Sequence, residues 1–455
     1  MIDNLFPYQL EGASWLTQNR FRLLADEMGL GKSAQTVVAA DQLSLVKILV
    51  ICPAVARINW EREFTQWTTK SREYKILQKM KDTPLENGVN ICSFEFATAN
   101  APKLKGPWDV VVIDETHYLK SVEAKRAKAI LGRDGIVRGS ARIWALSGTP
   151  APNHAGELWV LLYTFGATPL SHSAFVERYC DVMNTSFGQS ITGTKMSRIP
   201  ELKQILSQCM LRRKKMDVLK QLPHITYSDL VVEPGVVDID GGEPQSFIQY
   251  IFPNNRMEEL ETKLANERKI LEGMLGLESY NRDKMKMLEG MATSVSTLRR
   301  YSGIQKVEAV AKLVKEEIEA GLYTKLVIFA VHRDVIEMLR TRLNKLGVVT
   351  VYGGTDPDKR QRHIDKFQKN PRKPRIFIGN IAAAGTNITL TSAHNMIFIE
   401  QDWVPGNNAQ AAMRCHRIGQ KKNVHVRFVS LNNPVDMRIA AVLKRKTREL
   451  TEIFD

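Results

Sequence analysis

The sequence predicts an α/β protein with two lobes, each built on a parallel sheet. Three observations indicate this fold: a glycine-rich turn between an apolar pair and a helix-compatible segment, short apolar runs that alternate with helical patterns, and the return of that alternation in the second half of the chain. At 455 residues the chain is too long for one ordinary core, so two or three units are expected.

The glycine-rich turn lies in residues 24–33, which read Leu-Ala-Asp-Glu-Met-Gly-Leu-Gly-Lys-Ser. A strand, a tight glycine turn and a helix start would aim several backbone N–H groups at one point, which suits a phosphate chain. Lys32 could reach the β- and γ-phosphates, and the Ser33 hydroxyl could ligate Mg²⁺. The general phosphate-loop pattern has a glycine five residues before Gly31, where this chain has Asp26. A glycine-rich helix cap followed by a lysine remains the alternative for this stretch alone.

Four short apolar runs in the first half of the chain read as strands. Residues 108–113 are the clearest, and they deliver Asp114 and Glu115 at their C-terminal end. Residues 59–67 carry aromatic side chains at helical spacing. Strands that alternate with helices predict a doubly wound parallel sheet, whose ligands lie beyond the carboxyl ends of the strands. The other runs are residues 47–53, 89–92 and 143–150.

The second half resumes this alternation after a different middle segment. Residues from 156 to about 222 have a mostly helical pattern, and residues from about 223 to 242 look extended. The chain from about 255 to 300 is rich in Glu, Lys, Met and Leu, which predicts long helices with exposed faces. We expect a first lobe over 1–222 and a second over 223–455, with helical insertions over about 156–222 and 255–300. The strand-like runs of the second lobe are 325–330, 348–352, 375–379 and 395–399.

Composition narrows the class of protein. The formal net charge is +15, with basic clusters at 212–215, 299–300, 372–373 and 444–446, which favours a polyanionic partner, nucleic acid rather than an anionic membrane. No apolar run approaches the ~18 residues of a membrane span, and the N-terminus lacks the regions of a signal peptide. The five cysteines are scattered without a Cys-x-x-Cys, which fits a reduced cytoplasm rather than a disulfide framework or a zinc ribbon.

Two neighbouring carboxylates are candidates for metal binding and for general-base chemistry. Asp114 would hold Mg²⁺, directly or through water, while Glu115 would polarise the attacking water. An acidic helix N-cap is the alternative for one carboxylate, but it does not explain why a phosphate loop precedes the pair in the same lobe. Thr116 and His117 complete an Asp-Glu-x-His box.

Weaker signals lie near the two ends of the chain. The amide of Gln9 offers a donor and an acceptor together, which suits the edge of adenine, although an ordinary surface glutamine explains it equally well. Arg414 and Arg417 are three residues apart, so at helical spacing they would share a face. An arginine aimed at a phosphate held by another lobe is typically worth roughly 10³–10⁵ in rate. A charged face of a surface helix is the alternative.

Together, and in their order along the chain, these motifs resemble the helicase motifs of superfamily 2. Their residues are most similar to those of the Swi/Snf-type DNA translocases. The resemblance covers nearly the whole chain, and Asp26 is then the family's own form of the loop. Residues 175–181, 210–223 and 301–306 are most similar to the HepA-related annealing-helicase branch. The motifs that carry the resemblance are Gln9, residues 26–33, 114–117 and 147–150, and the Gln-Ala-x-x-Arg-x-His-Arg-Ile-Gly-Gln run over 410–420.

The resemblance implies two RecA-like lobes with ATP bound between them. It assigns catalytic roles to Lys32, Asp114, Glu115, Arg414 and Arg417, and Mg²⁺ to Ser33 and Asp114. The expected ATP contacts are Gln9, Asp26, Gly29, Leu30, Gly31, Lys32, Ser33, Gly385, Arg414 and Arg417. The expected DNA contacts are Pro53, Ala54, Trp60, His332, Gly354, Thr386 and Thr389.

The resemblance implies an ATP-dependent DNA translocase that remodels or anneals branched DNA or displaces bound protein. A strand-separating helicase and a nucleotide-gated DNA-binding module that docks a partner nuclease or replication protein are the alternatives. The family's Gly-Leu-Asn-Leu reads Asn-Ile-Thr-Leu at 387–390, and an acidic residue is replaced by Met413, which weakens the expected DNA contacts more than ATP hydrolysis. No accessory domain is recognised beside the core, so we expect the substrate-recognition modules of the annealing helicases to be missing or supplied by a protein partner. We also expect a monomer, associated with the nucleoid in the cytoplasm, of bacterial or phage origin.

Overall fold

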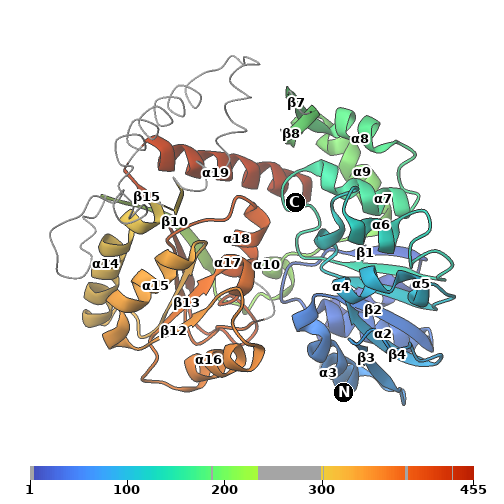
Figure 1. Cartoon of the computed structure of the whole chain (residues 1–455), viewed down its shortest axis with the longest axis horizontal. Coiled ribbons are helices and arrows are strands. Elements are labelled where there is room, and N and C mark those ends of the chain that lie inside the picture. The colour runs from blue at the N-terminus through green and yellow to red at the C-terminus, as the bar shows by residue number, and fades with distance from the viewer. Residues whose placement is uncertain are drawn as a thin grey trace. The chain divides into compact units, whose positions relative to one another are not determined.

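A computed structural model describes residues 5–185, 188–233, 299–300, 302–384, 388–432 and 434–454 (Figure 1). By its contacts the chain forms two compact units, the first comprising Met1–Met183, Ile191–Gln221 and Lys446–Asp455, and the second Asn184–Ser190 and Leu222–Arg445. The helices predicted over about 255–300 lie outside the described residues, apart from 299 and 300. Among the described residues, no helix is long and apolar enough to cross a membrane.

The first unit is organised around a sheet with the strand order β3-β4-β2-β5-β6-β1-β9, and every pair of neighbours is parallel. The predicted parallel sheet is confirmed. Leu24 and Asp114 are both paired with Leu146, so the phosphate-loop strand and the strand of the acidic pair end at one edge. The strands are β1 (Phe21–Leu24), β2 (Lys47–Cys52), β3 (Tyr74–Leu77), β4 (Gly88–Ser93), β5 (Val110–Asp114), β6 (Ile143–Leu146) and β9 (Met210–Leu211).

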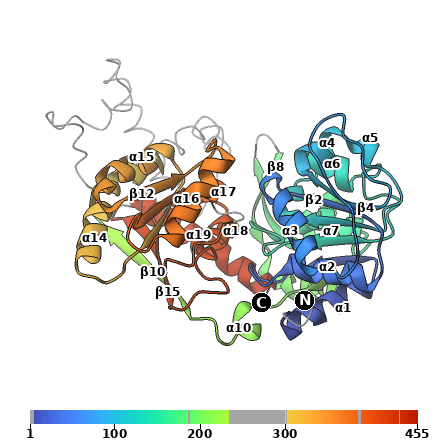
Figure 2. The same cartoon turned by 90° about the horizontal axis from the view of Figure 1, so that it is seen from below.

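Helices cover both faces of this sheet (Figure 1, Figure 2). Alternate residues of β2 and β5 point to opposite faces, so each face has its own apolar cluster. One face packs against α1 (Pro7–Thr17), α2 (Lys32–Gln42) and α3 (Arg57–Trp67). The other face packs against α4 (Phe94–Ala99), α6 (Lys125–Leu131), α7 (Trp159–Thr164), α8 (His172–Tyr179) and α9 (Ile199–Cys209).

The segment predicted to be mostly helical, 156–222, also contains strands. They are β7 (Cys180–Thr185) and β8 (Gly188–Thr194), which form a two-stranded sheet, and β9, which extends the main sheet beside β1. β9 has only two residues, too few for a periodic pattern, and it is specified by its pairing with Leu23 and Leu24. This unit also contains the short helices α5 (Ala101–Leu104) and α10 (Lys215–Val218).

The second unit has a six-stranded sheet with the order β10-β15-β14-β11-β13-β12, again with parallel neighbours throughout. One face packs against α14 (Val307–Glu319) and α15 (Arg333–Arg342), and the other against α16 (Pro357–Lys369), α17 (Ile381–Ala384) and α18 (Pro405–Ala412). The last helix, α19 (Pro434–Phe454), follows β15. The strands are β10 (Ile225–Val232), β11 (Leu326–Ala330), β12 (Val348–Val351), β13 (Ile376–Asn380), β14 (Asn395–Phe398) and β15 (Val424–Leu431).

Candidate active site

The glycine-rich turn joins β1 to α2 at the carboxyl edge of the first sheet. Gly29 and Gly31 have φ angles of 87° and 74°, in the left-handed region that favours glycine, and Gly31 is the N-cap of α2. A Cβ atom on Gly31 would lie 2.2 Å from Nε2 of Gln9. The backbone conformation therefore favours glycine at position 31, and a side chain there would also displace the Gln9 amide.

Gln9 is buried in the first turn of α1 and its amide is fixed in orientation. Nε2 donates to the carbonyl of Leu30 at 3.2 Å, and Oε1 accepts from the backbone N–H of Phe6 at 3.0 Å. The structure thus brings Gln9 against the phosphate loop. The same amide retains one further N–H and an acceptor lone pair in a set direction.

Lys32 is the first residue of α2, and its ammonium lies among carboxylates. Nζ donates to the backbone carbonyl of Asp26 at 2.7 Å. Burial lowers the pKa of Lys32, and the nearby charges of Glu115, Asp26 and Asp114 oppose that shift. The N-terminus of a helix and an ammonium side chain both favour an anionic ligand such as a phosphate chain.

The unusual Asp26 has a structural role in the loop. Its fully buried carboxylate accepts from Arg213 at both oxygens, Nε to Oδ1 at 3.0 Å and Nη2 to Oδ2 at 2.6 Å. Arg212 donates to the carbonyls of Ala25 at 3.0 Å and Gly148 at 3.2 Å. The basic cluster over 212–215 suggested a polyanion-binding surface, but these two arginines face the phosphate-loop edge. Sequence reasoning missed them because nothing in the sequence signals the pairing of β9 with β1.

The acidic pair follows β5 directly. Oδ1 of Asp114 accepts from the backbone N–H of Glu115 at 3.0 Å, and Oδ2 accepts from the indole N–H of Trp60 at 2.9 Å. Burial, with the neighbouring charge of Glu115, raises the pKa of Asp114 to about 6. Glu115 has a φ angle of 52°, which is strained for a residue with a side chain.

His117 connects the acidic pair to the loop after β6. Its Nδ1 lies 3.3 Å from Oε2 of Glu115 and 3.3 Å from Oγ of Ser147. Ser147 also accepts from the backbone N–H of Thr149 at 3.2 Å. A Cβ on Gly148 would lie 2.5 Å from the side chain of Met28 in the phosphate loop, so this loop packs closely on the glycine-rich turn.

The residues at this edge suit a magnesium ion held together with a phosphate chain. Asp114 supplies carboxylate oxygens, and Ser33, the second residue of α2, supplies a hydroxyl; both are hard oxygen donors. No cluster of three or more acidic, histidine or cysteine residues that could hold a metal alone exists among the described residues. Mg²⁺ usually binds through one or two carboxylates with water and substrate phosphates, and this donor set fits that mode.

The structure contradicts the predicted contact of Trp60 with DNA. Its ring is 1 % exposed within the core and its N–H is donated to Asp114, so the side chain cannot reach nucleic acid. Pro53, after β2, is also buried, whereas Ala54 is exposed. The predicted contact of Trp60 with DNA is therefore wrong, and its indole N–H instead binds the Asp114 carboxylate.

Other predicted DNA contacts lie in the second unit. Gly354, beyond β12, is exposed with a φ angle of 84°, and Thr389 is exposed and accepts from Nη1 of Arg417 at 3.2 Å. His332, at the start of α15, has its Nδ1 2.6 Å from Oε1 of Glu400. The contacts of these three residues with DNA stay predictions. Gly385 and Thr386 lie outside the described residues.

The two arginines of the second unit do not lie on a helix as their spacing suggested. α18 ends at Ala412, and Arg414 lies in the turn that follows. The backbone N–H of Arg414 donates to the carbonyl of Ala411 at 3.1 Å. The Gln420 amide donates to three carbonyls of this region, those of Thr391, Ala393 and Cys415, which fixes the loop. Arg414 is 2 % exposed, whereas Arg417 is partly exposed. The prediction of one shared helical face is therefore wrong.

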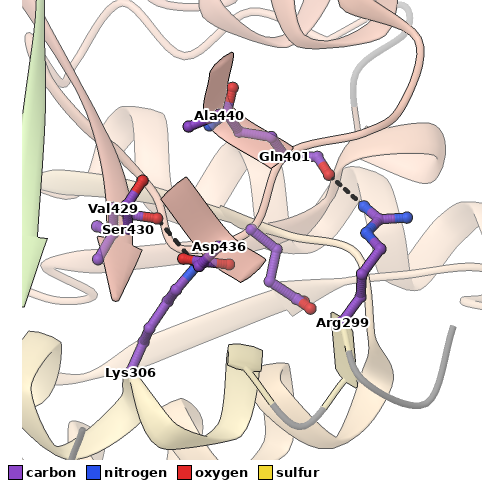
Figure 3. Close-up of a pocket in the computed structure, with 8 residues that line it drawn as sticks. Arg299, Lys306, Gln401, Val429, Ser430, Asp436 and Ala440 are labelled. Carbon is purple, nitrogen blue, oxygen red and sulfur yellow. Dashed lines mark hydrogen bonds and ion pairs between the residues drawn. The ribbon is translucent and has the colours of Figure 1, made fainter. Parts of the chain in front are cut away.

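The second unit also contains a small pocket lined by charged side chains (Figure 3). Nζ of Lys306 lies 2.7 Å from Oδ2 of Asp436 and donates to the carbonyl of Val429 at 3.0 Å. Arg299 donates to the carbonyl of Gln401. The cavity measures about 30 Å³, which is room for about one water molecule, and its charges have partners within the unit. We interpret this cluster as a structural anchor of the first turn of α19.

Two parallel α/β sheets, one with a phosphate loop and an acidic pair at its carboxyl edge, define an ATPase core of the helicase-like kind. The SNF2-related domain family matches residues 8–284, and the helicase conserved C-terminal domain family matches residues 305–419. The first match covers more than half of the chain, so this chain belongs to the SNF2-related family. The Swi/Snf resemblance and the two RecA-like lobes predicted from the sequence are confirmed.

The chain is similar over its full length to larger proteins. It is 28 % identical over 459 residues to the Xenopus laevis SWI/SNF-related matrix-associated actin-dependent regulator of chromatin subfamily A-like protein 1, covering 99 % of this chain and 44 % of that protein. The Drosophila melanogaster protein of that name is 30 % identical over 468 residues, covering 100 % and 56 %. Homo sapiens DNA annealing helicase and endonuclease ZRANB3 is 28 % identical over 462 residues, covering 98 % and 40 %.

The chain thus spans about half the length of these relatives. Among solved structures, the Sulfolobus solfataricus SWI2/SNF2 ATPase core in complex with dsDNA is 22 % identical, with a TM-score of 0.44, over 99 % of this chain and 97 % of that chain.

Proposed function

We propose that this protein hydrolyses ATP and uses the energy to move along DNA, where it remodels or anneals branched DNA or displaces bound protein. The observation that carries this proposal is the gathering of Lys32, Asp114 and Glu115 at one sheet edge, where the two carboxylates act on the charge of the lysine. Membership of the SNF2-related family supports it, as do the relatives, one of which is described as a DNA annealing helicase.

Each residue at this edge has a role that its chemistry supports. Lys32 and the N–H groups of the turn would neutralise the β- and γ-phosphates, and the fixed Gln9 amide would pair with the edge of adenine. Ser33 and Asp114 would hold Mg²⁺, which supplies charge neutralisation of the phosphates when bound. Glu115 would accept a proton from the attacking water and orient it, with His117 holding the carboxylate in place.

The remaining assignments stay proposals from the family pattern. Arg414 and Arg417 would contact phosphate, and Ala54, Pro53, His332, Gly354 and Thr389 would lie along the DNA track, which should rest mainly on phosphate contacts. We keep the lobe boundary near 222. Action as a monomer, recognition supplied by a partner, and a bacterial or phage origin are likewise proposals.

The deciding experiment measures ATP turnover with single-stranded, duplex and forked DNA side by side. We expect strong stimulation by duplex or forked DNA, loss of turnover in Lys32→Ala, and no unwinding of a blunt duplex. Absence of turnover under all conditions would leave a nucleotide-gated binding module, and unwinding of a blunt duplex would identify a strand-separating helicase. Because affinity should rest on phosphates, DNA binding should weaken steeply between about 50 and 200 mM salt.

A further inference from the structure

Arg213 lies at the centre of a buried polar cluster behind the phosphate loop. It reaches Asp26 across 187 residues of sequence, and its side chain is only 13 % exposed. Besides the two bonds to Asp26, Nη2 donates to Oε1 of Gln35 at 2.8 Å, and Nη1 donates to the backbone carbonyl of Tyr8. One guanidinium therefore binds the loop, α2 and the residue that precedes Gln9 on α1.

Gln35 extends this cluster to the far side of the loop. Its Nε2 donates to Oδ2 of Asp26 at 3.0 Å and to the carbonyl of Leu30 at 3.2 Å. Leu30 is the same carbonyl that accepts from Gln9 at 3.2 Å. Residues 26–30 are thus held at both ends by Gln35, whose Oε1 accepts from Arg213, and at Asp26 by Arg213 itself.

The approach of α1 to this cluster is close. A Cβ atom on Gly12 would lie 1.8 Å from Oε1 of Gln35 and 2.5 Å from Nη2 of Arg213, so a side chain at position 12 would displace these two groups. The guanidinium carbon also lies 5.3 Å from the centre of the Tyr8 ring. The guanidinium of Arg213 therefore contacts both α1, which carries the Gln9 amide, and the loop over 26–30.

The backbone reinforces this arrangement. The N–H of Ala25 donates to the carbonyl of Leu211 at 2.7 Å, and the N–H of Glu27 donates to the carbonyl of Arg213 at 2.9 Å. The carboxylate of Glu27 accepts from the N–H of Lys215 at 2.7 Å. These bonds hold the chain over 211–215 beside the loop, and they thereby fix the backbone position of Arg213.

From these contacts we infer that Arg213 is a positioning residue that sets the Gln9 amide in register with the phosphate loop and thereby determines selectivity for adenine nucleotides. Adenine offers a donor and an acceptor on its major-groove edge, whereas guanine offers two acceptors, so an amide held in one orientation distinguishes them and a loose amide does not. This inference rests on the proposed function, because it assumes that the loop binds a nucleoside triphosphate.

The test measures binding of fluorescent analogues of ATP and GTP, in the presence of Mg²⁺, to wild type and to Arg213→Lys. Lysine keeps the charge but cannot make the forked contact with Asp26 and also reach Gln35 and Tyr8. We expect the ratio of the GTP to the ATP dissociation constant to fall about tenfold, the effect of about one well-made hydrogen bond. The KM for ATP should rise by a similar factor while kcat changes far less.

The matched control is Arg72→Lys. Arg72 donates to Asp41 from Nε at 3.2 Å and from Nη2 at 2.7 Å and also binds the carbonyl of Leu45, and both charged side chains are under a tenth exposed. Asp41 lies roughly 14 Å along α2 from Lys32, at 1.5 Å per residue. We expect Arg72→Lys to lower the melting temperature as Arg213→Lys does, but to leave the nucleotide ratio unchanged.

Gln35→Met provides a second variant that keeps the side-chain shape and removes the amide oxygen and nitrogen, and we expect it to lower the same ratio by about fivefold. If Arg213→Lys is not folded, this variant decides. Equal ratios in wild type, Arg213→Lys and Gln35→Met would overturn the inference and leave the proposed function intact. A wild-type chain that binds neither nucleotide would overturn the proposed function, and the inference with it.

Discussion

A carboxylate follows a central strand in each unit, half-buried Asp114 in the first and buried Glu400 in the second, and the two differ in their hydrogen-bond partners. Asp114, at the end of β5, accepts one backbone and one indole N–H, and burial raises its pKa to about 6. Glu400, just after β14, accepts the backbone N–H groups of Val331 at 2.9 Å and His332 at 2.8 Å, and its other oxygen faces the His332 ring. Burial and the charge of Glu115 thus outweigh the charge of Lys32 at the first carboxylate, whereas the second accepts two backbone N–H groups of its own unit.

The helices that start beside these carboxylates differ accordingly. The N-terminus of α2 is preceded by a glycine turn with two left-handed residues and carries Lys32. The N-terminus of α15 is preceded directly by Val331 and His332, whose N–H groups bind Glu400. In the same parallel α/β design, one helix start therefore binds a carboxylate of its own unit, and we propose that the other binds an external anion.

The largest expected effect tests the role of the first unit. Glu115→Gln should lower ATP turnover by about 10²–10⁴-fold, the usual contribution of a general base, while ATP affinity stays close to that of wild type. Steady-state turnover and nucleotide binding measure the two quantities. Glu123→Gln, which changes an exposed glutamate paired with Lys128, is the control and should have wild-type turnover. Equal turnover in wild type and Glu115→Gln would contradict the assignment.

The next effect tests the internal anion of the second unit. Glu400→Gln should lower the free energy of unfolding by about 1.5–3 kcal/mol, because an amide cannot accept on both sides and the bonds lost are to a charged group. Denaturant unfolding measures it. Glu337→Gln, which removes an exposed pair with Arg340, should cost less than about 1 kcal/mol. A Glu400→Gln chain as stable as Glu337→Gln would show that the contact with α15 contributes nothing.

A smaller effect of opposite sign is expected for Asp114→Asn. The folded-state pKa of Asp114 is raised from 3.8 to about 6, so above pH 6 folding must bury a charge, and this cost vanishes as pH falls below about 4. Without metal, the asparagine variant should melt higher than wild type at pH 8 and equally at pH 4. Thermal unfolding in a chelator measures this. A variant less stable than wild type at pH 8 would refute the contrast with Glu400.

The smallest effect concerns Trp60→Phe. Losing the indole N–H should raise the Mg²⁺ concentration for half-maximal turnover by about five- to tenfold, since the remaining ring still fills the core. The control is Trp67→Phe on the same helix, which removes a comparable bond to Oε2 of Glu63 at 3.0 Å. If both variants require the same Mg²⁺ concentration as wild type, Trp60 does not position the acidic pair.

The sequence predicted the fold class and the family because those signals are local and periodic. The apolar runs at 47–53 and 395–399 correspond to β2 and β14, and the glycine turn corresponds to the start of α2. The DNA contact of Trp60 was mispredicted because the resemblance assigned it from a motif position, and that position does not tell which side of α3 faces the sheet. The turn at Arg414 was missed because a run of Gln, Ala and Arg favours helix, whereas Gln420 holds the chain in a loop.

The contact of Arg213 with Asp26 could not be predicted from local patterns at all. It depends on β9, a strand of two residues, which lies beside β1 and carries the arginine back to the loop. The site assignments of Lys32, Asp114 and Glu115 stay predictions, and the experiments above test them.

The left-handed backbone of Glu115 has a consequence for how this sequence would change under selection. A side chain in that conformation costs roughly 1–2 kcal/mol, and the buried charge of Asp114 next to it adds to the cost. A library of this chain screened for heat resistance alone, with no demand for turnover, should therefore accumulate glycine at 115 and asparagine at 114 before changes elsewhere in the core. The order in which residues are lost in such a screen would map where function has been kept at the expense of stability.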